Sequence, residues 1–233
     1  IAHNITSPEY ARETRAKIQR YAQPLDYYEA DFTSVDDHGT GHVATLDANG
    51  MAVSLTASVN LFFGSKRMSE STGIVWNNEM DDFSKPNQTN AFGYPPSRQN
   101  YIEARKRPQS SMSPIVLYDK RNGQVRLVVG AAGGSRILSS AAYVALRALL
   151  LGDDVKQAVD APRLHNQLAP MYTSYERAFP KVYIEALKRR NQTMKQWNKR
   201  TPMSKVAAIM ANQRAVYASA DPRRYSTAYP SGY

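Results

Sequence analysis

The chain has 233 residues, a formal net charge of +10 and 42% hydrophobic residues, which is typical of one large globular domain or two small ones. It lacks cysteine, so disulfides, thiolate metal sites and a cysteine nucleophile are excluded. Its longest apolar run, at 141–151, is interrupted by Arg147 and is too short to cross a membrane. Because the chain begins at Ile1 without a Met or a signal-peptide pattern, we expect a piece of a longer protein.

The first predicted element is a helix over residues 5–22, because Ser7 and Pro8 form a start signal and Pro24 an end signal. An extended connection is expected over 25–39. It leads into a loop rich in Asp and Gly that precedes the first strand.

A β-hairpin is predicted next, from residues 43–46 and 52–59, because an Asn-Gly turn separates two alternating segments. One face of the second strand is apolar and the other carries hydroxyls and an amide. We expect the polar face, with Ser58 and Asn60, to lie beside Thr40. A strand edge that faces solvent would show the same alternation.

The junction of Gly39 and Thr40 is the main candidate for chemistry. Thr40 is either an ordinary first residue of a strand or a nucleophile that is released when the Gly39–Thr40 bond is cut. In the second case its own α-amino group is the base that activates the hydroxyl. Glycine suits the position before such a bond because it tolerates unusual backbone angles.

Residues 77–83 combine two amides with three acids after a predicted short strand at 73–78. Closely spaced carboxylates usually bind a cation, which here is either a metal ion or the ammonium group of a ligand. The spacing fits no calcium loop, and an exposed acidic turn is the plain alternative. A long functional or mobile loop is expected over 84–108.

Strands are then predicted at 115–118 and 125–129, and the second runs through Gly133 and Gly134 into a helix at 135–151. Backbone amides at such a turn suit an oxyanion hole, whereas close packing of the helix on the strand is the other reason for the glycines. No lysine follows the glycines with P-loop spacing, so a nucleotide site is not expected. The buried side of the helix is expected to hold Ile137, Leu138, Ala141, Val144, Ala145 and Ala148.

The last third is expected to contain a short helix at 153–159, a mostly helical region at 174–213 and a final strand at 215–219. Residues 181–224 hold eleven basic and two acidic residues. Such a region either contacts nucleic acid or an anionic membrane, or is a solvated surface. His165 is expected to be structural.

Six motifs in a fixed order resemble the gamma-glutamyltransferase (glutathione hydrolase) family, which are N-terminal nucleophile hydrolases. They are DDHGTGH at 36–42, NLFFGS at 60–65, NNEMDDFS at 77–84, PQSSMSP at 108–114, VVGAAGG at 128–134 and PRLHNQ at 162–167. The resemblance covers essentially the whole chain and is weakest after about residue 181. It implies a mixed α/β (α+β) fold, the four-layer α/β/β/α sandwich, which is incomplete in this chain.

The resemblance also implies a precursor, or zymogen, that cuts itself into two subunits. Residues 1–39 would be the end of the large subunit and 40–233 the small catalytic subunit, together in one structural unit. The partner would be the remainder of the large subunit, which supplies an arginine for the substrate carboxylate. We therefore expect this chain alone to be inactive. The location implied is the outer face of the plasma membrane or the secreted fraction, with Asn4, Asn87 and Asn191 in glycosylation sequons.

By position, the resemblance assigns Thr40 as the nucleophile, Gly39 as the residue before the cut and Ser58 as the hydroxyl that supports Thr40. The other expected site residues are Asn60, Glu79 and Asp82 for the α-ammonium group, Ser110 and Ser111 for the α-carboxylate, and Gly133 and Gly134 for the oxyanion. No cofactor or metal is implied. Two departures are His38, where a small residue is expected, and Ser58, where many relatives have Thr; slower self-cleavage follows from the first.

The reaction implied is cleavage of the γ-glutamyl amide of glutathione and related compounds through an acyl-enzyme on Thr40. Water, an amino acid or a dipeptide then takes the glutamyl group. Two alternatives stay open at this point. One is a catalytically silent relative that acts by binding, and the other is a basic module that binds nucleic acid or a membrane surface.

Overall fold

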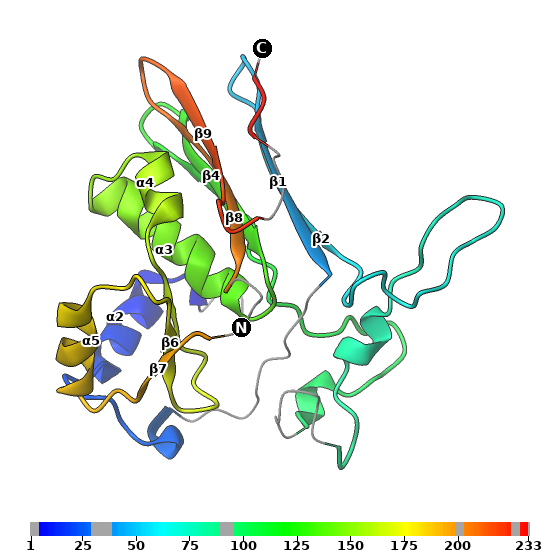
Figure 1. Ribbon diagram of the computed structural model, residues 1–233, viewed down its shortest axis with the longest axis horizontal. Helices are drawn as coiled ribbons and strands as arrows, with labels where there is room; N and C mark the ends of the chain where they lie inside the picture. The colour runs from blue at the N-terminus through cyan, green and yellow to red at the C-terminus, as the bar shows by residue number, and fades with distance from the viewer. Residues whose placement is uncertain (1–4, 29–38, 89–95, 199–202, 225–228, 233) are drawn as a thin grey trace.

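The computed structural model describes residues 5–28, 39–88, 96–198, 203–224 and 229–232. Two sheets pack face to face, with helices on the outer face of one of them (Figure 1). The smaller sheet is an antiparallel pair, β1 (Thr40–Leu46) and β2 (Ala52–Ser58). The larger is antiparallel in the order β3 (Ile115–Tyr118), β4 (Val125–Ala132), β8 (Lys205–Ala211) and β9 (Val216–Ala220).

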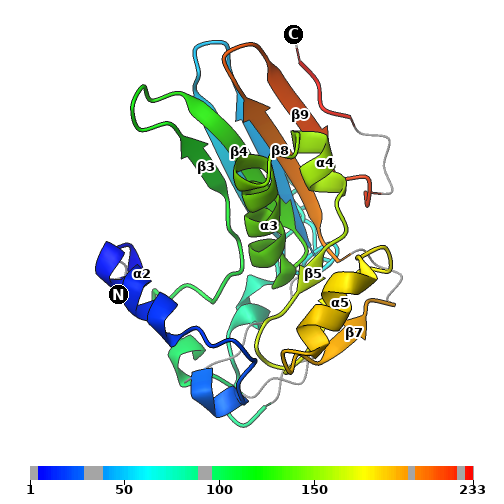
Figure 2. The same ribbon diagram turned by 90° about the vertical axis from the view of Figure 1, so that its left-hand side faces the viewer.

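Helices α3 (Arg136–Leu150) and α4 (Val155–Asp160) cover the larger sheet on the face away from the hairpin (Figure 2). A third, small sheet is formed by β5 (Leu164–His165), β6 (Thr173–Tyr175) and β7 (Met194–Gln196), beside α5 (Lys181–Lys188). The remaining elements are α2 (Pro8–Lys17) and the 3-10 turns η1 (Leu25–Tyr28), η2 (Glu79–Asp82) and η3 (Arg98–Asn100). The order helix, sheet, sheet gives three layers of the four-layer sandwich. None of the described helices is long and apolar enough to span a membrane.

The main core lies between the larger sheet and its helices. Side chains such as Leu127, Ile137 and Val206 are fully buried there. Burial of one such side chain contributes about 1.5–3 kcal/mol, so this cluster provides the rigid platform for the hairpin. The predicted strands and helix of this region are confirmed, except that Leu138 is 52% exposed, because it points away from the sheet.

Three other predictions need correction. The helix expected over 5–22 is only Pro8–Lys17: its Ser7 cap is confirmed, with the hydroxyl accepting from Tyr10 N at 3.1 Å, but Ile18 is already extended. The expected extended connection instead begins with η1, and residues 29–38 lie outside the described part. The expected strand at 73–78 is reduced to one bridge, between Met68 and Val75.

In its described part, the region 174–213, expected to be mostly helical, contains one helix, α5, together with the end of β6 and the strands β7 and β8. In β8 the side chains of Val206 and Ala208 are buried while their neighbours are less so, which is the period of a strand. Long-range pairing of β8 with both β4 and β9 outweighs the local helical preference of its alanines and methionine.

The hairpin turns its polar face inward. The hydroxyl of Ser54 donates to the carbonyl of Val129 on β4 at 3.2 Å, and His42 is buried against the same strand. The apolar face is the outer one, and Val43 and Leu55 on it are each 58% exposed. The predicted hairpin is confirmed. The alternative that its polar face points to solvent is wrong, because this face packs against β4.

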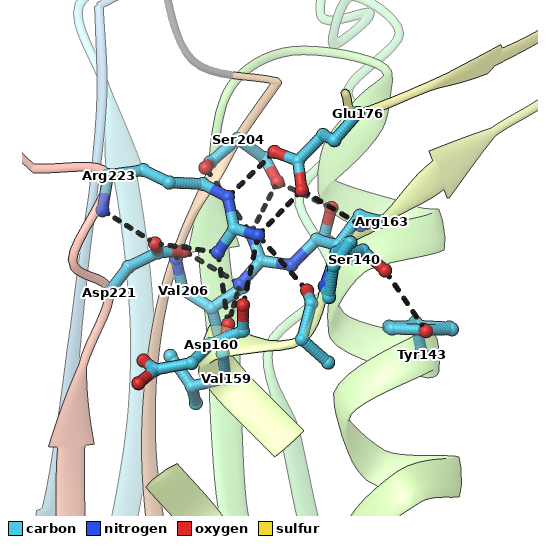
Figure 3. Close-up of polar contacts among 12 residues, drawn as sticks. Ser140, Tyr143, Val159, Asp160, Arg163, Glu176, Ser204, Val206, Asp221 and Arg223 are labelled. Atoms are coloured by element: carbon cyan, nitrogen blue, oxygen red, sulfur yellow. Dashed lines mark hydrogen bonds and ion pairs between the residues drawn. The ribbon is translucent and has the colours of Figure 1, made fainter. Parts of the chain in front are cut away.

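A buried ion-pair network ties the C-terminal segment to the core (Figure 3). The guanidinium of Arg163 pairs with Asp221 at 2.7 Å, and both side chains are fully buried. Arg163 also donates to the carbonyl oxygens of Val159 at 2.7 Å and Ser204 at 3.3 Å. Burial lowers the pKa of Arg163, and the negative charge of Asp221 opposes that shift. A second arginine, Arg223, binds Asp221 at 3.1 Å from the outside of the cluster.

We predict that Asp221→Asn lowers the free energy of unfolding by about 3–5 kcal/mol, because it leaves a buried arginine charge uncompensated. Chemical denaturation of the variant and of the unaltered protein measures this. Glu9→Gln is the matched control, since it breaks an exposed pair with Arg12 and should leave the midpoint unchanged. A loss below about 1 kcal/mol for Asp221→Asn would contradict the prediction.

Candidate active site

Thr40 is the first residue of β1, directly opposite Ser58 on β2. Its hydroxyl donates to Ser58 Oγ at 3.1 Å, and the backbone amide of Asn60 donates to the same oxygen at 2.9 Å. Ser58 is therefore held as an acceptor of the Thr40 proton. This geometry brings together three of the predicted site residues and suits the predicted support of a nucleophile by a second hydroxyl.

Gly39 is held tightly by the chain that follows β2. Its amide donates to the carbonyl of Asn60, and its carbonyl accepts from Val59 N at 3.2 Å. A Cβ at this position would stand 2.5 Å from the carbonyl oxygen of Leu61, which is closer than real Cβ atoms come. The glycine is thus required by the close approach of backbone, which is a different reason from the conformational freedom expected from the sequence. His38, the predicted departure, lies outside the described residues.

Asn60 connects the nucleophile strand to the acidic turn. It is buried, has a φ of 65°, and its side-chain amide donates to Asn78 O at 3.2 Å. In return, Asn78 Oδ1 accepts from Leu61 N at 3.1 Å. These two bonds fix the position of η2 relative to Thr40.

The three acids of η2 point in different directions. Asp81 is exposed and pairs with Lys85 at 3.0 Å. Asp82 is buried, and Glu79 is half-buried with Oε1 in the interior, where it makes no hydrogen bond to another described residue. The two inward acids are the two that were predicted to hold the ammonium group. Within the described ranges no group of three His, Cys, Asp or Glu residues could hold a metal ion, so this turn lacks the ligand set of a metal site.

Ser110 and Ser111 lie in the extended segment before β3. Ser110 is exposed, and its hydroxyl accepts from Met112 N at 3.2 Å, while Ser111 is half-buried. The preceding residue, Gln109, donates its backbone amide to Asn100 Oδ1 at 2.9 Å. Asn100 is a residue that the sequence reading missed, because it lies in a loop without periodicity.

Gly133 and Gly134 form the turn between β4 and α3, with φ angles of 135° and 62°. These are left-handed conformations that other residues rarely adopt. A Cβ on Gly133 would also stand 2.9 Å from Ser204 Cα. The nearest neighbour of Gly133 is therefore the chain that enters β8.

A hollow of about 640 Å³ contains Thr40 and Ala132, the residue before the two glycines. His42, Lys205 and Arg224 also line it. The candidate nucleophile and the last residue of β4 thus border one space. A hollow of about 740 Å³ between residues 14–28 and α5 contains none of the predicted site residues.

His42 lies between the two sheets, and its ring fills the space that a side chain on Gly130 would need. Nδ1 is 2.9 Å from Thr56 Oγ1, while Nε2 is buried without a hydrogen bond to any other described residue. Burial lowers the pKa of His42, and the positive charge of Arg224 lowers it further. The ring is therefore neutral at pH 7.

Two features of the last third are structural. The ring of His165 lies 2.8 Å from Ser139 Oγ and 2.8 Å from Gln167 Oε1, which agrees with the structural role expected. Arg223, part of the basic region, pairs with Glu176 at 2.6 Å in the interior network. The guanidinium of Arg223 therefore stabilises the fold through its ion pairs.

The family model for gamma-glutamyltranspeptidase matches residues 1–231. Scoloptoxin SSD14 of Scolopendra dehaani is 43% identical over 190 residues, which is 81% of this chain and 32% of that protein. Glutathione hydrolase proenzyme 2 of Schizosaccharomyces pombe is 37% identical over 232 residues, 98% of this chain and 38% of that protein. The chain therefore spans about a third of the length of these curated relatives. An Arabidopsis thaliana relative named putative inactive glutathione hydrolase 4 is 42% identical to this chain. The match covers 76% of this chain and 93% of that protein.

Among solved structures, the T380A mutant of Helicobacter pylori gamma-glutamyltranspeptidase matches with a TM-score of 0.70 and 35% identity. The match covers 78% of this chain and 99% of that chain. The described layers therefore have the architecture of a solved gamma-glutamyltranspeptidase chain.

We predict that the free energy of unfolding falls as the pH drops below about 6.5, the ordinary pKa of histidine. The pKa of His42 is lowered in the folded chain, so the unfolded chain takes up the proton at a higher pH; the contribution of His42 is therefore fully present above about pH 6.5 and declines below it. The slope approaches about 1.4 kcal/mol per pH unit for one proton. Denaturation of the unaltered protein and of His42→Gln between pH 5 and 8 measures this. Equal slopes in the two proteins would refute the assignment to His42.

Proposed function

The chain belongs to the gamma-glutamyltranspeptidase family, and on that basis we propose that Thr40 is a nucleophile that cleaves the γ-glutamyl amide of glutathione and related compounds. The single observation that carries this proposal is the hydrogen bond from the Thr40 hydroxyl to Ser58 Oγ at 3.1 Å, with Ser58 held by Asn60 N. A threonine hydroxyl is a weak nucleophile unless it is oriented and a base takes its proton; in this proposal Ser58 orients the hydroxyl and the α-amino group of Thr40 is the base.

Self-cleavage comes first. The Thr40 oxygen attacks the carbonyl carbon of Gly39, and its proton passes to the α-nitrogen of Thr40 as the peptide bond breaks. The bond from Val59 N to Gly39 O, 3.2 Å long, supports this step, since it stabilises the negative charge that develops on that oxygen. Water then hydrolyses the ester and leaves Gly39 as a carboxylate and Thr40 with an α-amino group.

Turnover uses the same oxygen. The α-amino group of Thr40 takes the hydroxyl proton, the oxygen attacks the γ-carbonyl, and the amide nitrogen leaves with that proton. Gly133 and Gly134 offer backbone amides to the oxyanion in this proposal, and Ala132, the residue before them, lines the same hollow as Thr40. Water or the amine of an acceptor amino acid or dipeptide then takes the glutamyl group, so the protein is a hydrolase and an acyltransferase.

The substrate's amino-acid head carries one positive and one negative charge. We assign its ammonium group to Asn60, Glu79 and Asp82, of which the two acids are turned inward. Ser110 and Ser111 are assigned to its carboxylate. The interior carboxylate oxygen of Glu79 supports the first assignment, because a buried negative group is stabilised by a cation.

The remainder of the large subunit is the proposed protein partner. The outer face of the hairpin, with Val43, Val53 and Leu55, is apolar and exposed, and a further layer would remove it from water. We also propose an extracellular or secreted location. The sequon residues Asn87 and Asn191 are exposed, as a glycan requires, whereas Asn4 lies outside the described residues.

A role in binding without catalysis is the second candidate function. It is supported by the Arabidopsis relative that is named putative inactive. It predicts an uncut chain that still binds glutamate. A nucleic-acid or membrane binder is less well supported, because Arg223 of the basic region is engaged inside the fold. Steep loss of DNA or anionic-lipid binding with added salt would support that reading instead.

We predict that Thr40→Ala abolishes both self-cleavage and γ-glutamyl turnover in the full-length protein. Mass spectrometry shows whether one chain ends at Gly39 and another begins at Thr40, and release of p-nitroaniline from γ-glutamyl-p-nitroanilide measures turnover. Thr45→Ala is the matched control, because Thr45 lies on the same strand but on the outer face. Cleavage retained in Thr40→Ala would refute the assignment.

We further predict that Ser58→Ala lowers kcat by about 100-fold, because the hydrogen bond to Ser58 Oγ orients the Thr40 hydroxyl and a misplacement of about 1 Å can cost that factor. Ser54→Ala is its control: it removes a hydroxyl from the same strand face, where Ser54 bonds to Val129 O. Steady-state kinetics on mature protein separates the two. Equal kcat in both variants would show that Ser58 does not support the nucleophile.

A further inference from the structure

The two groups of residues assigned to the substrate head come from separate segments of the chain. Glu79 and Asp82 belong to η2, whereas Ser110 and Ser111 belong to the segment before β3. The ammonium and carboxylate groups of an α-amino acid share one carbon atom, so their binding groups need a fixed separation. A misplacement of about 1 Å can cost about 100-fold in rate. Some interaction must therefore hold η2 and the serine segment in register.

Asn100 provides that interaction. Its side-chain nitrogen donates to Asp82 O at 2.7 Å, and its side-chain oxygen accepts from Gln109 N at 2.9 Å. One amide thus bonds to the backbone of an inward acid and to the residue just before Ser110. The side chain is buried, so water competes poorly for either bond.

We propose that Asn100 is a positioning residue that sets the distance between the ammonium and carboxylate subsites and so selects substrates with an intact α-amino-acid head. This inference rests on the function proposed above. Asn100 itself is not assigned a contact with substrate. It acts on the substrate indirectly, by fixing the positions of Asp82 and Ser110.

The backbone of Asn100 makes its own hydrogen bonds, so the contribution of the side chain can be measured separately. Ser84 N donates to the carbonyl of Asn100 at 2.9 Å, and Asn100 N donates to Ser97 O at 3.1 Å. Both backbone bonds survive a change of side chain. Replacing the side chain therefore removes the link between the two subsites while the turn that carries it keeps its own bonds.

The test uses Asn100→Leu in the full-length protein, because leucine has a similar volume and makes neither bond. Asn166→Leu is the matched control. Its amide also donates to a backbone carbonyl, Tyr172 O at 3.2 Å, and accepts from a backbone amide, Leu168 N at 2.8 Å, but it lies in a loop that holds none of the subsite residues. Asn100→Asp keeps the acceptor for Gln109 and loses the donor to Asp82, so it should fall between Asn100→Leu and the unaltered protein.

Kinetics compares γ-glutamyl-p-nitroanilide with glutaryl-p-nitroanilide, which lacks the α-ammonium group. We expect Asn100→Leu to raise KM for the first at least about tenfold and to reduce the preference for it over the second, with an unfolding midpoint like that of Asn166→Leu. Equal loss on both compounds, or the same kinetics in both variants, would overturn the inference.

Failure of the proposed function gives a different result. An unaltered protein that turns over neither compound would remove the catalytic proposal, and calorimetry with L-glutamate and glutarate then tests the inference by binding alone. A preference for L-glutamate that Asn100→Leu reduces at least about tenfold supports the positioning role. If the leucine variant does not fold, the preference for L-glutamate over glutarate is measured with Asn100→Asp instead. An unchanged preference in a folded variant would refute the role.

Discussion

The buried pair of Arg163 and Asp221 is the constraint on which most of the described fold depends. Two charges without water require good geometry and further hydrogen bonds, and the chain supplies them from α4 and the approach to β8. The approach to β8 passes Ser204, which stands against Gly133. The ion pair in the core is thus connected, through Ser204, to the glycine turn at the end of β4.

The second constraint on the structure is the orientation of the hairpin, whose polar face points inward against β4. Thr40, His42 and Ser58 lie on the face that meets β4, and the apolar face is exposed. A polar face in an interior is costly unless its groups are hydrogen-bonded, and Ser54 and Thr56 show how they are. The arrangement fits the proposed role of Thr40 as a nucleophile and leaves an apolar outer face for the proposed further layer.

Two asparagines then join the hairpin to the rest of the site. Asn60 links the end of β2 to the acidic turn, and Asn100 links that turn to the serine segment. An amide suits this task because it donates and accepts at once and so satisfies a carbonyl on one side and an N–H on the other. The side-chain amides of Asn60 and Asn100 therefore fix how the end of β2, the acidic turn and the serine segment lie relative to one another.

The sequence by itself determined the hairpin, the pair β3 and β4, the helix after the glycines and the family, because these follow from local alternation, turn residues and ordered motifs. It also named the candidate site residues, and the roles of Thr40, Glu79 and Ser110 stay predictions. It failed at 174–213, where β8 is a strand because β4 and β9 pair with it. Only the tertiary structure decided that the polar hairpin face is interior, that Gly39 lies too close to the backbone of Leu61 for a side chain, and that the Asn100 amide bonds to both Asp82 O and Gln109 N. Each of these depends on contacts between segments far apart in the chain, which local patterns do not encode.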